Sequence, residues 1–156
     1  MNPGDEVEDF EAVDQTGTPV RLSELTAAGP VVLFFYPKAM TKGCTAESCH
    51  FRDLASDFQA VGARAVGISA DSVERQARFD EMHGLGLPLL SDPDRRIASM
   101  LGVKRPGPLF NRRMTFVIGA DRRVIEVIKS EVSMDSHADQ ALAVLRARSG
   151  EQPTTS

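Results

Sequence analysis

The chain contains two cysteines, and they lie close together in the sequence. Cys44 and Cys49 occur in the segment TKGCTAESC, and the 156 residues contain no other cysteine. An apolar run that predicts a strand precedes them and a helical pattern follows, so Cys44 is expected where a loop becomes a helix N-terminus. Unpaired N–H groups and the positive end of the helix dipole favour a thiolate at such a position. Because the thiolate is the nucleophilic form, this placement predicts a reactive Cys44.

The five-residue spacing of the two cysteines restricts how they can react with each other. Residues five apart in an α-helix are separated by ~7.5 Å along the helix axis and point to different faces. A disulfide needs Cα atoms within about 7 Å of each other and converging Cβ vectors. Cys44 and Cys49 therefore cannot be joined while the helix is intact. If they do form a disulfide, the first turns of the helix must unwind.

Several residues around Cys44 could assist its chemistry. The Thr41 hydroxyl could accept from the thiol and donate to a substrate oxygen, although a lone threonine here is more often a helix cap. Pro37 ends the apolar strand and could shield the site from water. Glu47, one helical turn after Cys44, could orient an arginine or only complement the helix dipole. Lys42 could stabilise a thiolate but is more often a surface charge.

Strand and helix patterns alternate along the chain. Strands are expected at residues 10–13, 20–22, 31–36, 65–69, 88–90, 115–118 and 124–128, the first two forming a hairpin. Helices are expected at residues 44–61, 72–83 and 95–101, and from Asp135 or Ser136 to Arg148. In the first of these helices, the side chains expected to face the core are Phe51, Leu54, Ala55 and Phe58. This order predicts an α/β fold, a mixed central sheet flanked by helices on both faces.

Composition excludes several classes of protein. The length fits one domain, expected at residues 1–149, with a flexible tail at 150–156. A net charge of −4 argues against nucleic-acid binding, and no apolar run approaches the ~20 residues that span a membrane. Two cysteines are too few for a secreted disulfide framework, so a cytoplasmic, reducing compartment is expected. Cys44, Cys49 and His50 are too few for a structural zinc site, so no metal is expected.

The cysteine segment resembles the peroxiredoxins. Pro37, Thr41 and Cys44 fit the PxxxTxxC motif of that family, and the paired Cys49 is typical of the bacterioferritin-comigratory-protein, or peroxiredoxin Q, branch. The resemblance runs from the GDEVEDF segment to the SMDSHAD segment. It implies a thioredoxin-like fold with an N-terminal β-hairpin. It also implies that Arg113, just before a strand, contacts the sulfur and the peroxide.

The resemblance implies a thiol-dependent peroxidase. In this branch the residue matching Cys44 is the peroxidatic cysteine, which hydrogen peroxide or an organic hydroperoxide oxidises to a sulfenic acid. The residue matching Cys49 resolves it as an intrachain disulfide, which thioredoxin or another dithiol reductant reduces. Such relatives need no cofactor and are often monomeric. Lys42 departs from the family, which usually has proline there, and this departure could ease unwinding.

Two alternatives remain open at this point. A thioredoxin-like oxidoreductase would need a CxxC motif at the helix start, whereas four residues separate Cys44 from Cys49. A redox-sensing or holdase module could use the same disulfide as a switch without turnover. Rapid, stoichiometric consumption of peroxide by the reduced protein would favour the enzyme over the switch.

Overall fold

The most apolar run of the chain forms the central strand of a seven-stranded sheet. In the computed structural model, which describes residues 1–106, 110–131 and 133–150, strand β3 (Val31–Phe35) is buried throughout its length. It pairs with β4 (Arg64–Ser69) in parallel and with β6 (Met114–Ile118) in an antiparallel arrangement. Helices cover both faces of the sheet at β3, which explains why the strand is continuously apolar rather than alternating.

The remaining strands extend the sheet to both sides, in the order β2-β1-β5-β4-β3-β6-β7. They are β1 (Glu11–Val13), β2 (Pro19–Arg21), β5 (Leu89–Ser91) and β7 (Val124–Lys129). All seven predicted strands are present. No observed strand end differs from the predicted one by more than one residue. The predicted N-terminal hairpin is confirmed, since β1 and β2 are antiparallel partners. The α/β class and the mixed sheet are therefore confirmed.

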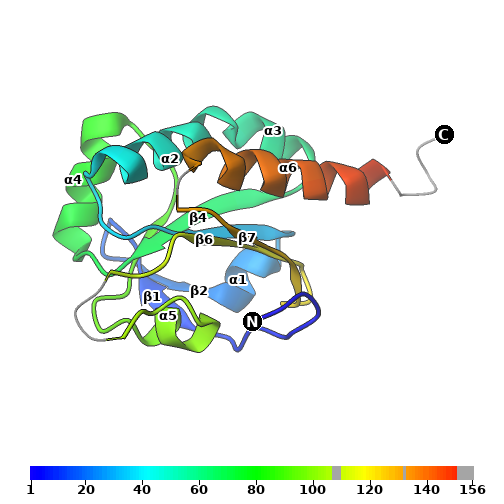
Figure 1. The fold of residues 1–156 in the computed structure, drawn as a ribbon, viewed down its shortest axis with the longest axis horizontal. Helices are drawn as coiled ribbons and strands as arrows, with labels where there is room; N and C mark the ends of the chain where they lie inside the picture. The colour runs from blue at the N-terminus through cyan, green and yellow to red at the C-terminus, as the bar shows by residue number, and fades with distance from the viewer. Residues whose placement is uncertain (107–109, 132, 151–156) are drawn as a thin grey trace.

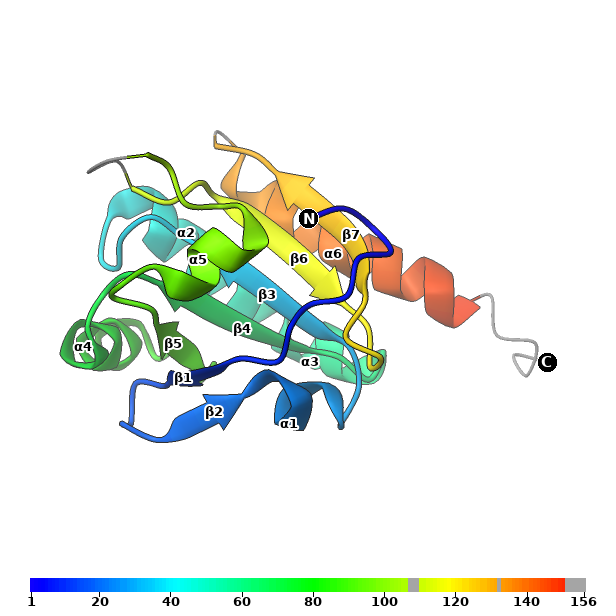
Figure 2. The same ribbon diagram turned by 90° about the horizontal axis from the view of Figure 1, so that it is seen from below.

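Within the described residues, six helices cover the two faces of the sheet (Figures 1 and 2). They are α1 (Leu22–Thr26), α2 (Lys42–Asp53), α3 (Ala55–Ala60), α4 (Val73–His83), α5 (Arg96–Leu101) and α6 (Met134–Gly150). Helices α2, α3, α4 and α6 lie over one face, and α1 and α5 lie over the other. Successive side chains of β3 point to opposite faces of the sheet. Phe34 therefore packs in the core beneath α2, α3, α4 and α6, and Phe35 packs in the core beneath α1 and α5.

The helix predicted at residues 44–61 is in fact two helices. Helix α2 starts at Lys42, and the backbone leaves helical geometry at Leu54, where φ is −95° and ψ is 7°. Phe51 and Phe58 face the core as predicted, and Leu54 packs against it while partly buried. The prediction for Ala55 is wrong, since this residue is exposed. Because the helix breaks at Leu54, Ala55 does not fall on the buried face, whereas Phe58, seven residues after Phe51, does.

The other helix ends follow local signals in most places. Ser72 caps α4 by accepting from the N–H of Arg75, and Gly84 ends that helix in a left-handed conformation with φ of 56°. Helix α6 begins at Met134, before either of the two predicted capping residues, and ends at Gly150. The rest of the predicted tail, residues 151–156, lies outside the described residues.

None of the helices within residues 1–106, 110–131 and 133–150 is both long and apolar enough to cross a membrane.

Candidate active site

The loop between β3 and α2 delivers Cys44 to the first turn of α2. After Pro37 the chain turns at Met40, whose φ is 67°, and Thr41 then adopts an extended conformation at the N-cap position. Because α2 begins at Lys42, Cys44 is the third helical residue rather than the first. Its N–H still belongs to the four that lack an intrahelical acceptor, so Cys44 does lie at the N-terminus of a helix.

The Arg113 guanidinium lies against the Cys44 sulfur. Arg113 precedes β6, and its Nη2 donates to the Sγ of Cys44 at 3.4 Å. Its Nη1 donates to the Oε1 of Glu47 at 2.6 Å, so each of the two terminal nitrogens of the planar group has a partner on α2. Cys44 and Glu47 are fully buried and Arg113 nearly so, whereas the neighbouring Arg112 is exposed. The structure therefore places Arg113, and not Arg112, at the thiol.

Glu47 is a fully buried carboxyl group with only one of its oxygens paired. Burial raises the pKa of Glu47 to about 7, although the charge and hydrogen bond of Arg113 act in the opposite direction. Its Oε2 has no hydrogen-bond partner among the described residues and lies 3.7 Å from the Nδ1 of His137. The predicted position of Glu47 beside an arginine is thus what the structure shows.

His137 is a member of this cluster that the sequence reasoning missed. It lies on α6 with no exposed surface; its Nε2 is 2.8 Å from the carbonyl oxygen of Ser130, and its Nδ1 is 2.8 Å from the Thr115 hydroxyl. A carbonyl only accepts, so Nε2 carries the proton and Nδ1 accepts from Thr115. Burial lowers the pKa of His137, which favours this neutral form. Its position four residues before Ala141 in the predicted last helix, on the same face as that apolar residue, was the available sequence signal.

Thr41 and Pro37 lie on the loop that leads from β3 to Cys44. The Thr41 side chain is exposed, and its hydroxyl donates to the carbonyl of Lys38 at 2.8 Å instead of capping α2. The Thr41 carbonyl accepts from the N–H and the hydroxyl of Thr45, at 2.9 and 2.7 Å. Pro37 is half-buried, and Lys42 is exposed. In this arrangement the Thr41 oxygen has free lone pairs, but its proton is engaged by Lys38.

Gly43 allows the arginine to approach the helix start closely. A Cβ at this position would lie 3.3 Å from the Nη2 of Arg113 and 3.3 Å from the Sδ of Met134. Any larger side chain would have to displace one of these two groups. The absence of a side chain at Gly43 is therefore part of what brings the guanidinium to the sulfur.

Cys49 is separated from Cys44 by an intact helix. Both cysteines are free thiols, and α2 is continuous from Lys42 to Asp53. Cys49 is partly buried and packs against the core beneath α2. The next residue, His50, pairs with Asp139 of α6 at 2.7 Å and ties the middle of α2 to that helix. This structure is the reduced, fully helical arrangement.

No group of three or more His, Cys, Asp or Glu side chains within residues 1–106, 110–131 and 133–150 is placed to hold a metal ion.

Comparison with known proteins gives consistent matches over nearly the whole chain. Residues 3–127 match the AhpC/TSA family. A Mycobacterium tuberculosis protein named as a peroxiredoxin is 60% identical over 154 residues, which cover 96% of this chain and 100% of the relative. Peroxiredoxin Bcp of Bacillus subtilis is 34% identical over 149 residues, which cover 92% of this chain and 94% of that protein.

The fold is also that of solved structures. The crystal structure of peroxidoxin BcpB from Mycobacterium tuberculosis superimposes with a TM-score of 0.92 and 58% sequence identity. The match covers 94% of this chain and 97% of that chain. The thioredoxin-like fold expected from the cysteine segment is thereby confirmed.

Proposed function

The chain belongs to the AhpC/TSA family of peroxiredoxins, and we propose that it reduces hydroperoxides with Cys44 as the attacking thiol and Cys49 as the resolving thiol. Family membership establishes a thiol peroxidase. The assignment of the two cysteines rests chiefly on one observation, the contact of 3.4 Å between the Arg113 guanidinium and the Cys44 sulfur. Of the two cysteines, only Cys44 has this contact, and it also lies in the first turn of α2.

In the first step the Cys44 thiolate attacks the terminal oxygen of the hydroperoxide. A sulfur–oxygen bond forms as the oxygen–oxygen bond breaks, so the sulfur loses two electrons and becomes a sulfenic acid. The other oxygen leaves as an alkoxide or hydroxide and takes a proton to become an alcohol or water. Negative charge therefore moves from the sulfur to the leaving oxygen during this step.

Arg113 suits this movement of charge. A guanidinium has several donors in a fixed plane and stays charged throughout, so it can donate to the sulfur and to the peroxide oxygen together. Glu47 binds one terminal nitrogen of the plane while the other contacts the sulfur, which lowers the cost of reorganisation in the transition state. We assign Thr41 to the peroxide as well, and its hydroxyl must release Lys38 before it can donate there. Pro37 shields the mouth of the site.

The second step needs a change in α2. The Cys49 thiolate attacks the sulfenic sulfur, a disulfide forms, and the hydroxyl group leaves as water after taking a proton. The spacing of the two cysteines forbids this bond in the helix seen here, so the first turns of α2 must unwind first. A dithiol reductant of the thioredoxin class then reduces the disulfide, and its own two thiols become a disulfide.

The test is turnover of the reduced protein with one equivalent of hydrogen peroxide. Wild type should consume the peroxide and yield an intrachain Cys44–Cys49 disulfide by peptide mass spectrometry. Cys49→Ser should still consume one equivalent but accumulate sulfenic acid, whereas Cys44→Ser should consume none. Peroxide consumption near the wild-type rate in Cys44→Ser would refute the assignment of the attacking thiol. Disulfides found only between chains would refute the assignment of the resolving thiol.

The comparisons do not favour the alternative of a redox-sensing or holdase module without turnover, because the named relatives are peroxiredoxins. Repeated turnover with a dithiol reductant, against both hydrogen peroxide and an organic hydroperoxide, separates the two functions. The monomeric state and the cytoplasmic location expected from the sequence remain predictions.

A further inference from the structure

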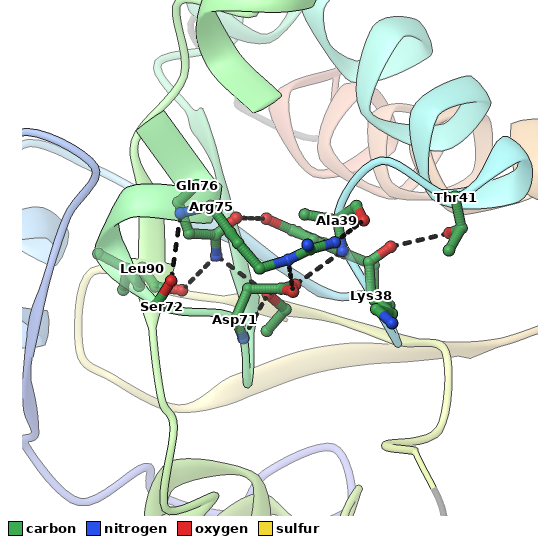
Figure 3. A network of polar contacts seen from close by, with 10 residues as sticks. Lys38, Ala39, Thr41, Asp71, Ser72, Arg75, Gln76 and Leu90 are labelled. Atoms are coloured by element: carbon green, nitrogen blue, oxygen red, sulfur yellow. Dashed lines mark hydrogen bonds and ion pairs between the residues drawn. The ribbon is translucent and has the colours of Figure 1, made fainter. Parts of the chain in front are cut away.

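The loop that leads to Cys44 is held at one residue by side chains from a different part of the chain. The N–H of Ala39 donates to the Oδ2 of Asp71 at 2.7 Å, and the carbonyl of Ala39 accepts from the Nη2 of Arg75 at 3.1 Å. Figure 3 shows the Asp71 and Arg75 side chains beside Ala39. Both backbone polar groups of this buried residue are thus bonded to the region where β4 ends and α4 begins. We call the pair Asp71 and Arg75 the Ala39 clamp.

The Ala39 clamp is itself braced. The Oδ1 of Asp71 accepts from the Nε of Arg75 at 3.0 Å, one helical turn further along. The Oδ2 of Asp71 also accepts from the Ser69 hydroxyl at 2.6 Å. The Ser69 oxygen accepts in turn from the Gln76 amide at 3.0 Å, and Gln76 accepts from the buried Tyr36 hydroxyl. The carboxylate is nearly buried and both of its oxygens are used, so its bonds to Ala39 and Arg75 are charge-assisted and directional.

The position of the clamp in the chain gives it significance for the chemistry. Ala39 lies five residues before Cys44, and the residue that follows it, Met40, has a φ of 67°, which is uncommon for a side chain other than glycine. Such a conformation persists only where the surrounding structure imposes it. Fixing Ala39 on both sides imposes it here, and the turn at Met40 sets the direction in which α2 begins.

We propose that Asp71 and Arg75 are positioning residues that hold the helix start bearing Cys44 in its reactive place and mark the upstream limit of the segment that unwinds. This inference rests on the proposed function. Residues up to Ala39 stay attached to β4 and α4, whereas the chain from Met40 onward is free to move when α2 melts. The clamp acts through the backbone and touches neither the thiol nor the peroxide.

The two chemical steps should respond differently when the clamp is removed. Attack on peroxide needs the folded site, and a displacement of about 1 Å in a reacting group can cost about a hundredfold in rate. Formation of the disulfide needs the unfolded helix start, so weakening the folded arrangement should leave this step equally fast or faster. A residue that supports only global stability would not separate the two steps in this way.

The experiment measures both steps in variants of the clamp. Arg75→Met removes the bond to the Ala39 carbonyl at a side chain that is 38% exposed, and Asp71→Ala removes the buried carboxylate. Arg78→Gln, an exposed arginine on the same helix, is the matched control. Quenched flow with hydrogen peroxide, followed by mass spectrometry, counts sulfenic acid and disulfide separately. The first step should slow about ten- to a hundredfold in both clamp variants, with the second step not slowed and Arg78→Gln unchanged.

Amide exchange of Ala39 in the reduced protein, followed by NMR, tests the clamp without any peroxide. The Ala39 amide should be protected in wild type and in Arg78→Gln, and it should exchange faster in Arg75→Met. If Arg75→Met exposes the Ala39 amide but leaves the first step at the wild-type rate, the positioning role is refuted. Equal slowing of both steps would also refute it. Failure of wild type to react with peroxide would instead refute the proposed function, and the exchange result would then still report on the clamp.

If Asp71→Ala does not fold, Arg75→Met still tests the proposal. Its side chain is partly exposed, and circular dichroism can show that the substitution preserves the structure.

Discussion

At the scale of single residues, an arginine that bonds to two side chains of α2 lies at the Cys44 thiol. Arg113 donates to the Cys44 sulfur through one nitrogen and to Glu47 through another. Its Nε has no hydrogen-bond partner among the described residues, so the Nη groups alone fix its plane. Arg113 therefore presents a nearly buried positive charge in direct contact with the Cys44 sulfur.

Arg113→Ala should therefore slow the first step strongly. Removing a donor aimed at developing charge typically costs about a hundred- to a thousandfold in rate, and here a stabiliser of the thiolate is removed as well. Stopped-flow competition with a second peroxidase measures this rate constant. Arg112→Ala is the matched control, because that side chain is exposed and should be near neutral. A harmless Arg113→Ala with a damaging Arg112→Ala would show that the wrong arginine has been assigned.

Glu47 should leave a signature in the pH dependence of stability. Burial raises its pKa from 4.5 to about 7, so between these two pH values the native chain binds a proton that the unfolded chain has lost. Under this linkage the stabilising effect is complete below about pH 4.5 and is lost as the pH rises through about 7. Urea unfolding at several pH values, compared with Glu47→Gln, measures the effect. The stability of wild type relative to the variant should fall by up to a few kcal/mol from pH 4.5 to pH 7 and then level off.

A relative stability that instead rises over this pH range would mean that pairing with Arg113 outweighs burial at Glu47.

At the scale of elements, the two ends of α2 are held by different kinds of contact. Near its C-terminal end, Phe51 stacks on Phe34 with ring centroids 4.0 Å apart, and His50 is tied to Asp139. At its N-terminal end no side chain caps the helix, and the polar contacts of Cys44 and Glu47 with Arg113 hold the first turns. The contacts of Phe51 and His50 do not involve these first turns. Local unwinding from Lys42 is therefore compatible with a stable remainder of the molecule.

Amide hydrogen exchange should reveal this unwinding directly. Residues 45–51 should be protected in the reduced protein and should exchange much faster in the disulfide form, because the bond cannot fit the helix. Residues 75–83 of α4 serve as the internal control and should be equally protected in both states. If residues 45–51 were equally protected in both states, unwinding could not be part of turnover.

At the scale of the whole molecule, the aromatic core between β3 and α2 links stability to the site. Phe34 is fully buried and stacks on Phe51, which in turn lies 5.9 Å from Phe58 between ring centroids. Phe34→Ala should destabilise the protein by about 3–5 kcal/mol in urea unfolding, since it removes a large buried side chain and leaves a cavity. Met82→Ala, at a side chain in a residue that is 61% exposed, is the control and should change stability by less than about 0.5 kcal/mol. A loss below about 1 kcal/mol in Phe34→Ala would argue against this packing.

The sequence by itself determined the local features of this protein. Apolar runs and capping residues predicted the seven strands and most of the helix ends, because strand and helix periodicity follow from which side chains must be buried. Local geometry also placed Cys44 near a helix start. It showed in addition that Cys44 and Cys49 are too far apart in an intact helix to form a disulfide. The break at Leu54 escaped prediction, because the apolar spacing of Phe51 and Phe58 continues across it.

Tertiary structure alone decided which distant side chains surround the thiol. Arg113 lies 69 positions from Cys44 in the sequence, His137 approaches Glu47 from the last helix, and Asp71 reaches the backbone of Ala39 across 32 positions. The family resemblance pointed to Arg113, but no periodicity in the chain linked these residues to one another. Such contacts depend on how strands pair and helices pack, and each polar partner is chosen because a buried donor or acceptor left unpaired is costly. Local sequence patterns record which residues are buried, whereas the folded chain determines which buried groups meet.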